Sequence, residues 1–189
     1  MKHIALALFL LTLTSCAAFK LVKPQSATVH GITLTPTSSW NKVNGNPHKK
    51  SQLWTKDGLA LNELYIIGNI ADGETIFKSS NKELPLPSFK AGMLPNELEE
   101  FVKTSLKNSH GGSINVNTES MAPQMIGEDV GFRMELSYFL EGGLKKSVDA
   151  LVAVKNDKLY MVMYVSPSLH YAERYKAEVN SIFGSISVL

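Results

Sequence analysis

The stretch LYMVMYV, residues 159–165, decides the fold because it is apolar at every position. A strand with apolar side chains on both faces is expected in the centre of a sheet that is covered on both sides. Since side chains alternate along a strand, Met161 and Met163 should share one face. The opposite face should then carry Tyr160, Val162 and Tyr164. We therefore expect a layer of structure packed against each side of this strand.

The segments before this stretch have the pattern of further strands. In Phe132–Leu140 apolar residues alternate with polar ones, which is typical of a half-buried strand. Glycines at 142 and 143 indicate a turn into a second strand at Lys146–Lys155, and Asn156-Asp157 indicates a turn into the central strand. A weaker strand is predicted at Ile114–Glu119.

The N-terminal half supplies three more expected strands. Ile32–Thr35 is predicted as a strand that ends at Pro36, and the turn after it should bring Trp40 onto the core. The segments Ser51–Lys56 and Leu59–Ile67 flank Asp57-Gly58, which favours a hairpin with a tight type I′ turn.

Two helices complete the pattern. After a proline-rich crossover loop at 79–95, the first should begin at Asn96, form a capping pattern with Glu99, and end at Gly111-Gly112. The second should begin after Ser166-Pro167. Their expected apolar faces are Leu94, Leu98, Phe101, Val102 and Leu106 in the first helix, and Leu169, Ala172, Val179, Ile182 and Phe183 in the second. The order β-β-β-α-β-β-β-α predicts an α+β domain, an antiparallel sheet packed with two helices.

The first residues have the features of an export signal. Lys2 precedes a short apolar run that ends in small residues, and the run is too short to cross a bilayer as a helix. Leu13-Thr14-Ser15-Cys16 resembles the lipobox of bacterial lipoproteins. The resemblance implies cleavage before Cys16 and lipid on its thiol and new amine, which would anchor the chain firmly. The alternative is an ordinary secretory signal with a cysteine near its cleavage site.

The lipobox resemblance also predicts the domain organisation and the location. Residues 1–15 would be the signal peptide, 16–27 a lipidated polar tether, and 28–189 a single α+β domain. Ala17 follows the cysteine where an aspartate would favour the inner membrane, so we expect the outer membrane, with the domain facing the periplasm. Cys16 is the only cysteine, so the chain cannot form an internal disulfide.

The charge balance argues against nucleic acid as a partner. Without residues 1–15 the chain carries 18 basic and 17 acidic side chains, scattered along the sequence. Nucleic-acid binding usually needs a dense stripe of lysine and arginine that neutralises phosphates.

Several short patterns together resemble the PsbP-like fold, which is named for an extrinsic photosystem II subunit. They are Ile32-Thr33-Leu34 leading through Pro36 to Trp40, Gly131-Phe132-Arg133 at a strand start, Lys158-Leu159-Tyr160, and Ile182 with Ser185-Ile186 at the end. The resemblance covers residues 29 to 187 and implies an accessory or binding role. The calcium and manganese positions of photosynthetic members have no counterpart here, so no cofactor or metal residue is carried over.

Enzyme signatures are missing from the sequence. There is no Gly-x-Ser-x-Gly elbow, no His-Glu-x-x-His and no phosphate-binding glycine loop. His110-Gly111-Gly112 is similar to an esterase oxyanion strand, but a helix stop explains it. His170 and Glu173, one turn apart on a helix, could share a metal with the distant His30, His48 and His110, although a solvated helix face is favoured. Capping likewise explains the acidic cluster Glu97, Glu99 and Glu100.

We expect a non-catalytic accessory or protein-interaction domain of the cell envelope, with an unknown envelope partner. The possible interaction loop contains Met121, Met125 and Ile126, apolar residues before Gly127. Two alternatives stay open. The first is a carrier or sensor that binds a small apolar ligand between sheet and helix, where Tyr160, Met161, Met163 and Tyr164 could line the pocket, although core packing is favoured for them. The second is a hydrolase that uses Ser, His and Asp from scattered loops.

Overall fold

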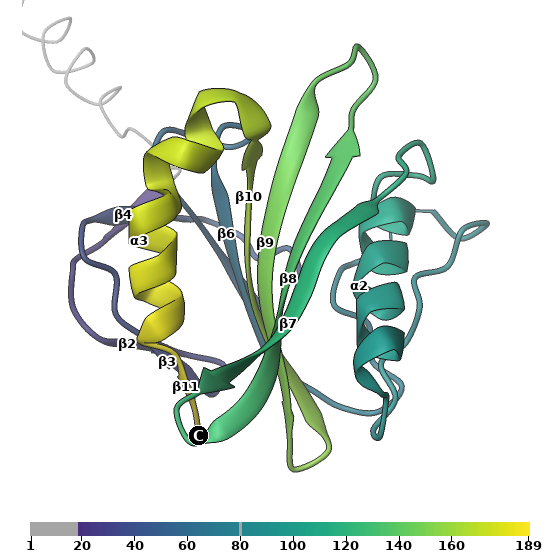
Figure 1. Ribbon diagram of the computed structural model, residues 1–189, viewed down its shortest axis with the longest axis horizontal. Coiled ribbons are helices and arrows are strands. Elements are labelled where there is room, and N and C mark those ends of the chain that lie inside the picture. The colour runs from purple at the N-terminus through teal and green to yellow at the C-terminus, as the bar shows by residue number, and fades with distance from the viewer. Residues whose placement is uncertain (1–18, 80) are drawn as a thin grey trace, which may run out of the picture.

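The computed structural model describes residues 19–79 and 81–189, and an eight-stranded antiparallel sheet forms its centre (Figure 1). The predicted signal peptide and Cys16 lie outside the described residues. The strand order in the sheet is β1-β4-β5-β6-β10-β9-β8-β7. The bounds are β1 Phe19–Val22, β4 Trp40–Val43, β5 Ser51–Thr55, β6 Glu63–Ile70, β7 Asn117–Ile126, β8 Asp129–Phe139, β9 Lys145–Lys155 and β10 Lys158–Pro167.

The central position of β10 confirms the prediction made from residues 159–165. Both faces of this strand are covered (Figure 1). Met161 and Met163 belong to a core formed with helix α2 (Pro95–Ser109), and Tyr160, Val162 and Tyr164 belong to a second core formed with helix α3 (Glu173–Gly184). A three-stranded sheet, β11-β3-β2, joins α3 on its side; its strands are β2 Ala27–Val29, β3 Ile32–Leu34 and β11 Ser187–Val188. The predicted α+β class with two helices is thus confirmed.

The chain enters the sheet earlier than the sequence predicts. Phe19–Val22, expected to be part of a tether, forms β1 and pairs with β4, with Phe19 opposite Val43 and Val22 opposite Trp40. The tether prediction is therefore wrong for these residues. Lysines at the edge of a sheet are compatible with a strand because only one side of it is paired.

The β5–β6 hairpin forms, but its turn is longer than the predicted two residues. The last pair of the hairpin is Trp54 with Leu64; β5 ends at Thr55 and β6 begins at Glu63, so residues 56–62 make the connection. Asn62 is fully buried and organises it: its Oδ1 accepts hydrogen bonds from Thr55 Oγ1 at 2.9 Å and from the Lys56 amide at 2.7 Å. A buried asparagine thus takes the place of the type I′ turn expected at Asp57-Gly58.

Both helices begin at positions other than those predicted. In α2 the Glu97 carboxylate accepts a hydrogen bond from the Leu94 amide at 2.7 Å, so Leu94 and Glu97 form the cap in place of Asn96 and Glu99. Leu94 is consequently exposed, while the rest of the predicted apolar face is buried. After β10 an irregular turn, η1 (Ser168–Ala172), delays α3 to Glu173, and Leu169 is 86% exposed rather than core.

Candidate functional site

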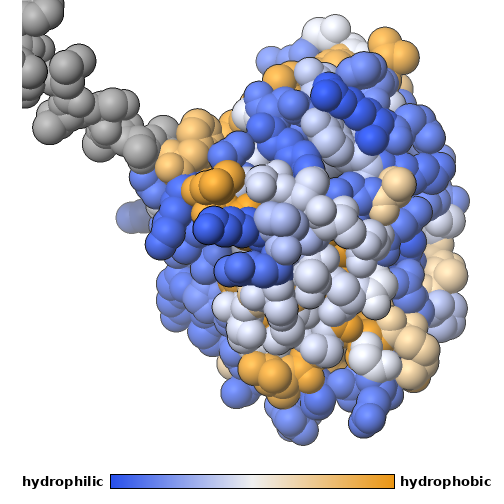
Figure 2. Space-filling view, turned by 90° about the vertical axis from the view of Figure 1, so that its left-hand side faces the viewer, coloured by the Kyte–Doolittle hydropathy of each residue, from blue (hydrophilic) through white to orange (hydrophobic). Residues whose placement is uncertain are grey.

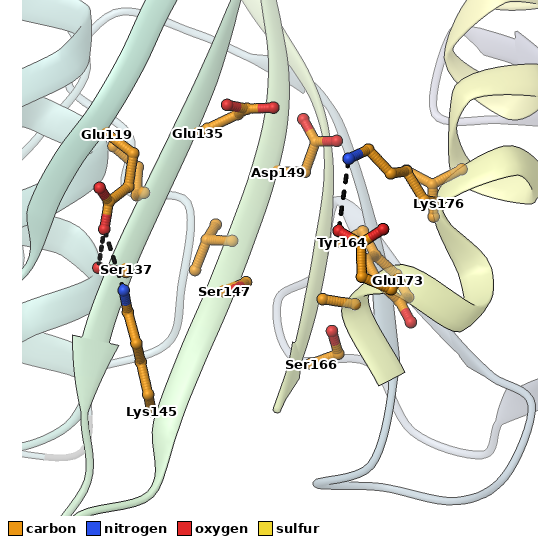
Figure 3. Close-up of a pocket in the computed structure, with 14 residues that line it drawn as sticks. Glu119, Glu135, Ser137, Lys145, Ser147, Asp149, Tyr164, Ser166, Glu173 and Lys176 are labelled. Carbon is orange, nitrogen blue, oxygen red and sulfur yellow. Dashed lines mark hydrogen bonds and ion pairs between the residues drawn. The ribbon is translucent and has the colours of Figure 1, made fainter. Parts of the chain in front are cut away.

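A polar cleft of about 270 Å³ lies between α3 and the part of the sheet that α3 leaves uncovered (Figure 3). One wall and the floor come from β7 to β10, and the other wall comes from the start of α3. Figure 3 shows acidic, hydroxyl and lysine side chains around this space.

Two rows of polar residues cross β8, β9 and β10 in the cleft. In one row Glu135 is opposite Asp149, which is opposite Tyr164. The second row contains Ser137, Ser147 and Ser166, in the same cross-strand register. Directly opposed residues point to the same face of a sheet, so strand register alone brings these six side chains together.

A β-bulge adds a carboxylate to the cleft. The register of β7 against β8 shifts between Thr118 and Ser120, which leaves Glu119 without an opposite residue and directed into the cleft. Ser137 Oγ donates a 2.6 Å hydrogen bond to Glu119, and Lys145 Nζ lies 3.3 Å from the same carboxylate. The hydrogen bond from Ser137 and the ammonium of Lys145 lower the pKa of Glu119, so it is ionised at neutral pH.

Asp149 is held by Arg133 in a two-point contact. Arg133 Nε lies 2.8 Å from one carboxylate oxygen and a terminal guanidinium nitrogen lies 2.5 Å from the other. Burial raises the pKa of Asp149, and the guanidinium opposes this shift. The neighbouring Glu135 is exposed and accepts a 2.8 Å hydrogen bond from Ser120 Oγ. Of the two opposed carboxylates, Glu135 is therefore the one open to a ligand.

The floor and the α3 wall add hydroxyls and one ion pair. Tyr164 donates a 3.3 Å hydrogen bond to the Tyr171 carbonyl, and burial raises the pKa of its phenol far above its usual range. Ser166 is buried, and its Oγ has no hydrogen-bond partner within the described part of the chain. Glu173 and Lys176 pair at 3.4 Å along the α3 wall of the cleft (Figure 3). Four acids and two lysines line the cleft, so its charge is net negative.

A second cleft, of about 260 Å³, lies on the α2 side of the sheet. Its walls include three aromatic rings, of Tyr65, Phe77 and Tyr138, and its floor includes Met163 and Val165. Burial raises the pKa of Tyr138 to about 12, so its phenol is neutral at physiological pH. This aromatic cleft suits a small apolar ligand better than an ion.

The serine and histidine that meet in the aromatic cleft are not arranged as a nucleophile and its base. Ser109 Oγ donates to the Leu106 carbonyl at 2.8 Å, and His110 Nδ1 lies 2.9 Å from that same carbonyl. Only a protonated Nδ1 can satisfy a carbonyl oxygen, so this nitrogen is a donor and cannot take the proton of Ser109. The pair therefore has the geometry of a helix C-terminus.

The predicted interaction loop is wrong as a loop, because Met121, Met125 and Ile126 lie in the edge strand β7. Ile126 is 2% exposed and packs in the α3-side core, whereas Met125 is 56% exposed. Met121 is partly buried against the α2-side core. Only Met125 of the three offers an apolar side chain to a partner.

The four histidines of the described residues, His30, His48, His110 and His170, are dispersed, and the structure does not bring them together. His48 is buried, and its Nδ1 accepts a hydrogen bond from the Lys50 amide at 3.2 Å. Burial lowers the pKa of His48. His170 lies in the irregular turn before α3, so it does not share a helix with Glu173 as expected. Within residues 19–79 and 81–189, no three His, Cys, Asp or Glu side chains are grouped to hold a metal ion.

Helix capping, which was expected to explain the whole acidic cluster on α2, explains only one of its three residues. Glu97 caps the helix, and Glu99 and Glu100 pair with Lys103 at 3.6 and 3.7 Å. The residues that sequence reasoning missed are those of the polar cleft, Glu119, Glu135, Ser137, Lys145, Ser147, Asp149, Ser166 and Lys176. The alternation of polar residues in β8 and in β9 was a usable signal, but without the strand register it indicated only a solvent-facing side.

The antiparallel sheet and its two helices form an α+β domain with the PsbP-like fold. No family model matches the sequence, and no curated protein is similar enough to match. Among solved structures the chain is similar to the cyanobacterial PsbP protein CyanoP of Synechocystis, with 10% identity, a TM-score of 0.58, and 93% of this chain and 95% of that chain covered. The likeness establishes the fold.

Two further solved structures were found by the same comparison. One is a protein of Bacteroides thetaiotaomicron with 11% identity and a TM-score of 0.50; 89% of this chain is covered, but only 49% of that chain. The other is LpqN of Mycobacterium tuberculosis, described as involved in cell envelope biogenesis, with 9% identity, a TM-score of 0.40 and coverage of 93% and 87%. Among the described residues no helix is long and apolar enough to span a membrane.

Proposed function

We propose that this chain is a lipid-anchored, non-catalytic binding protein of the bacterial envelope, and that the polar cleft beside α3 is where its partner docks. The observation that carries the proposal is the pair of polar rows across β8, β9 and β10, which face an open space of about 270 Å³. A core-forming sheet face has no packing reason to collect three carboxylates and three serines at one end.

The charge of the cleft indicates what the partner presents. Four acids against two lysines and the Arg133 guanidinium favour a lysine or arginine side chain of a partner protein, which the exposed Glu135 could bind. Docking by addition of a strand to β7 is disfavoured, because Pro123 and the bulge at Glu119 interrupt that edge. The partner is therefore expected to bind through side chains.

Site-specific photo-crosslinking in intact cells tests the docking site. A photoreactive residue at Glu173, on the rim of the cleft, should give a discrete adduct, and the same residue at the exposed Lys90, beyond the cleft, should not. Glu135→Lys in the Glu173 background should reduce the adduct several-fold, because it reverses the charge that the partner meets. An adduct that is insensitive to Glu135→Lys would show that the cleft does not select the partner.

Lipid attachment at Cys16 is tested separately. Leu13-Thr14-Ser15-Cys16 supports cleavage before the cysteine and an outer-membrane anchor facing the periplasm. Cys16→Ser should leave uncleaved precursor that incorporates no labelled fatty acid. A variant that is still labelled and fractionates like the wild type would exclude Cys16 as the anchor.

A second candidate function is the binding of a small apolar ligand in the aromatic cleft, which the rings of Tyr65, Phe77 and Tyr138 favour. A small phenolic or aliphatic compound should raise the unfolding temperature of the wild type. Val165→Phe, which would fill the floor, should remove this shift. If the compound stabilises both proteins equally, it binds elsewhere and this candidate fails.

A further inference from the structure

A groove at the opposite edge of the sheet is lined by lysines and by no acid of the described chain. It measures about 430 Å³ and lies between β1 and β2, with Gln52 and Trp54 of β5 along it. The three lysines are Lys20, Lys23 and Lys42. Neither of the two clefts described above shares a residue with this groove.

The groove brings like charges together without compensation. Lys20 and Lys42 are directly opposite each other on β1 and β4, an arrangement that destabilises a sheet. Within residues 19–79 and 81–189, none of the three lysines is in an ion pair or donates a side-chain hydrogen bond. Seven of the other thirteen lysines in the described part of the chain pair with acids; they are Lys49, Lys50, Lys56, Lys103, Lys145, Lys155 and Lys176. Such a cluster has the chemistry of a phosphate site.

The position of the groove in the chain points to the source of that phosphate. Phe19, the first residue of β1, is three residues after Cys16, a distance of at most about 11 Å along an extended chain. A lipid on Cys16 would therefore hold β1 against the membrane surface. Phe19 and Leu21 are exposed and alternate with Lys20, so this edge offers apolar side chains beside charged ones. Figure 2 shows apolar and strongly hydrophilic surface side by side where the described chain begins.

We infer that this groove binds the phosphate of an anionic phospholipid headgroup in the membrane that holds Cys16, so that the domain lies on that membrane by its β1 edge. The inference rests on the proposed lipid anchor. Each lysine close to an anionic membrane surface strengthens attachment, and the contribution decreases as salt screens the charges. The tether predicted from the sequence would leave the domain free to move, whereas docking through β1 restricts it to one orientation.

Amide hydrogen exchange on the mature lipoprotein tests the docking. The protein is purified with its lipid and placed in vesicles of 30% phosphatidylglycerol and 70% phosphatidylcholine, or of phosphatidylcholine alone. Amides of residues 19–29 should exchange about tenfold more slowly on the anionic vesicles, and raised salt should remove the difference. Equal exchange on both vesicles would overturn the proposal.

Matched variants and soluble phosphate complete the test. Lys20→Gln, Lys23→Gln and Lys42→Gln together should abolish the protection and leave the unfolding midpoint equal or higher, because the cross-strand repulsion is gone. The control triple Lys82→Gln, Lys90→Gln and Lys158→Gln, at exposed sites outside the groove, should keep the protection. Inorganic phosphate or glycerol phosphate that protects residues 19–29 equally on phosphatidylcholine would reassign the groove to a free anion and overturn the membrane source.

The mass of the N-terminal peptide separates the two proposals. If Cys16 carries no lipid, the anchor fails, and co-sedimentation of the same chain with anionic vesicles then tests the groove alone. Co-sedimentation that the lysine triple does not change would overturn the groove as well.

Discussion

The two faces of the central sheet are covered in different ways. On the α2 side an apolar stripe packs on an apolar sheet face; the residues are Leu98, Phe101, Val102 and Leu106 of the helix and Met134, Met161 and Met163 of the strands. On the α3 side the core formed by Trp40, Trp54 and Phe183 gives way, towards β8 and β9, to the polar cleft. The α2 face combines apolar packing with the aromatic cleft, and the α3 face combines apolar packing with an open polar surface.

Polar groups on the α3 side themselves have two different uses. The Glu178 carboxylate of α3 accepts hydrogen bonds from the Thr37 and Ser38 amides and from Trp40 Nε1, each at 3.2 Å, and from the Ser38 hydroxyl at 3.0 Å. Tyr175 donates a 2.6 Å hydrogen bond to Asp57. These contacts fasten the helix, whereas Glu135 and Glu173 in the cleft face open space. The comparison teaches that a charged residue becomes a candidate for binding where its contacts are few and exposed, as are those of Glu135 with Ser120 and of Glu173 with Lys176.

The largest expected effect lies on the packed face. Met163 is fully buried in the α2-side core, so Met163→Ala should lower the free energy of unfolding by about 2–5 kcal/mol. Met125→Ala is the matched control, because Met125 is exposed, and it should change stability by less than about 0.5 kcal/mol. Urea denaturation measures both. If Met163→Ala changes the free energy of unfolding as little as Met125→Ala, the α2 face is not the tightly packed face of the sheet.

The next effect lies in the contacts that fasten α3. Glu178→Ala should cost about 1–3 kcal/mol, because it leaves the buried Trp40 indole N–H and two backbone amides without their acceptor. Glu173→Ala, on the same helix but at the cleft, should cost far less, since within the described part of the chain Glu173 pairs only with the exposed Lys176. Equal losses from both variants would show that the cleft acids are also structural.

The pH dependence of the unfolding free energy should also show that the Glu178 carboxylate is structural. Burial raises the pKa of Glu178, but the hydrogen bonds from Thr37, Trp40 and Ser38 outweigh burial and lower it from its usual 4.5. The stability that Glu178 adds should therefore be complete above pH 4.5 and be lost as the pH falls through the lowered pKa. Glu178→Gln should flatten this part of the profile of unfolding free energy against pH. A profile that keeps the wild-type slope would assign the acid sensitivity to other carboxylates.

The contrast between buried core residues and exposed polar residues also explains which parts of the fold the sequence could predict. Residues 159–165 are apolar throughout because both cores need them, so the central strand could be identified from composition. Strand β1 was missed, and β7 was found only in part, by the weak strand predicted at Ile114–Glu119, because both faces of these edge strands are largely exposed and apolar and polar residues do not alternate in them. The helix faces at Leu98 to Leu106 and Val179 to Phe183 were predictable for the same reason as the core.

The cleft depends on information that a single sequence does not contain. Glu135, Asp149 and Tyr164 are far apart in the chain and meet only because of the register of β8, β9 and β10. Glu119 joins them through a bulge, and the irregular turn before α3 decides where Glu173 and Lys176 stand. Individual polar residues were visible in the sequence, but their convergence results from registers and irregularities that local patterns do not encode.

The smallest expected change in stability tests whether the cleft is kept for binding. Glu135 is directly opposite Asp149, and like charges at opposed positions destabilise a sheet. Glu135→Gln removes the repulsion but keeps the size and a hydrogen-bonding oxygen for Ser120, so it should leave stability unchanged or raise it by a few tenths of a kcal/mol.

Asp149→Asn, in contrast, should destabilise the protein, because it weakens the two-point contact with Arg133. A double-mutant cycle in urea should then give a coupling energy whose sign corresponds to repulsion between the two carboxylates. A carboxylate that costs stability is expected to persist where a ligand needs it. A loss of more than about 1 kcal/mol on Glu135→Gln would instead place Glu135 with Glu178 among the structural contacts, and the proposed docking site would lose its main exposed charge.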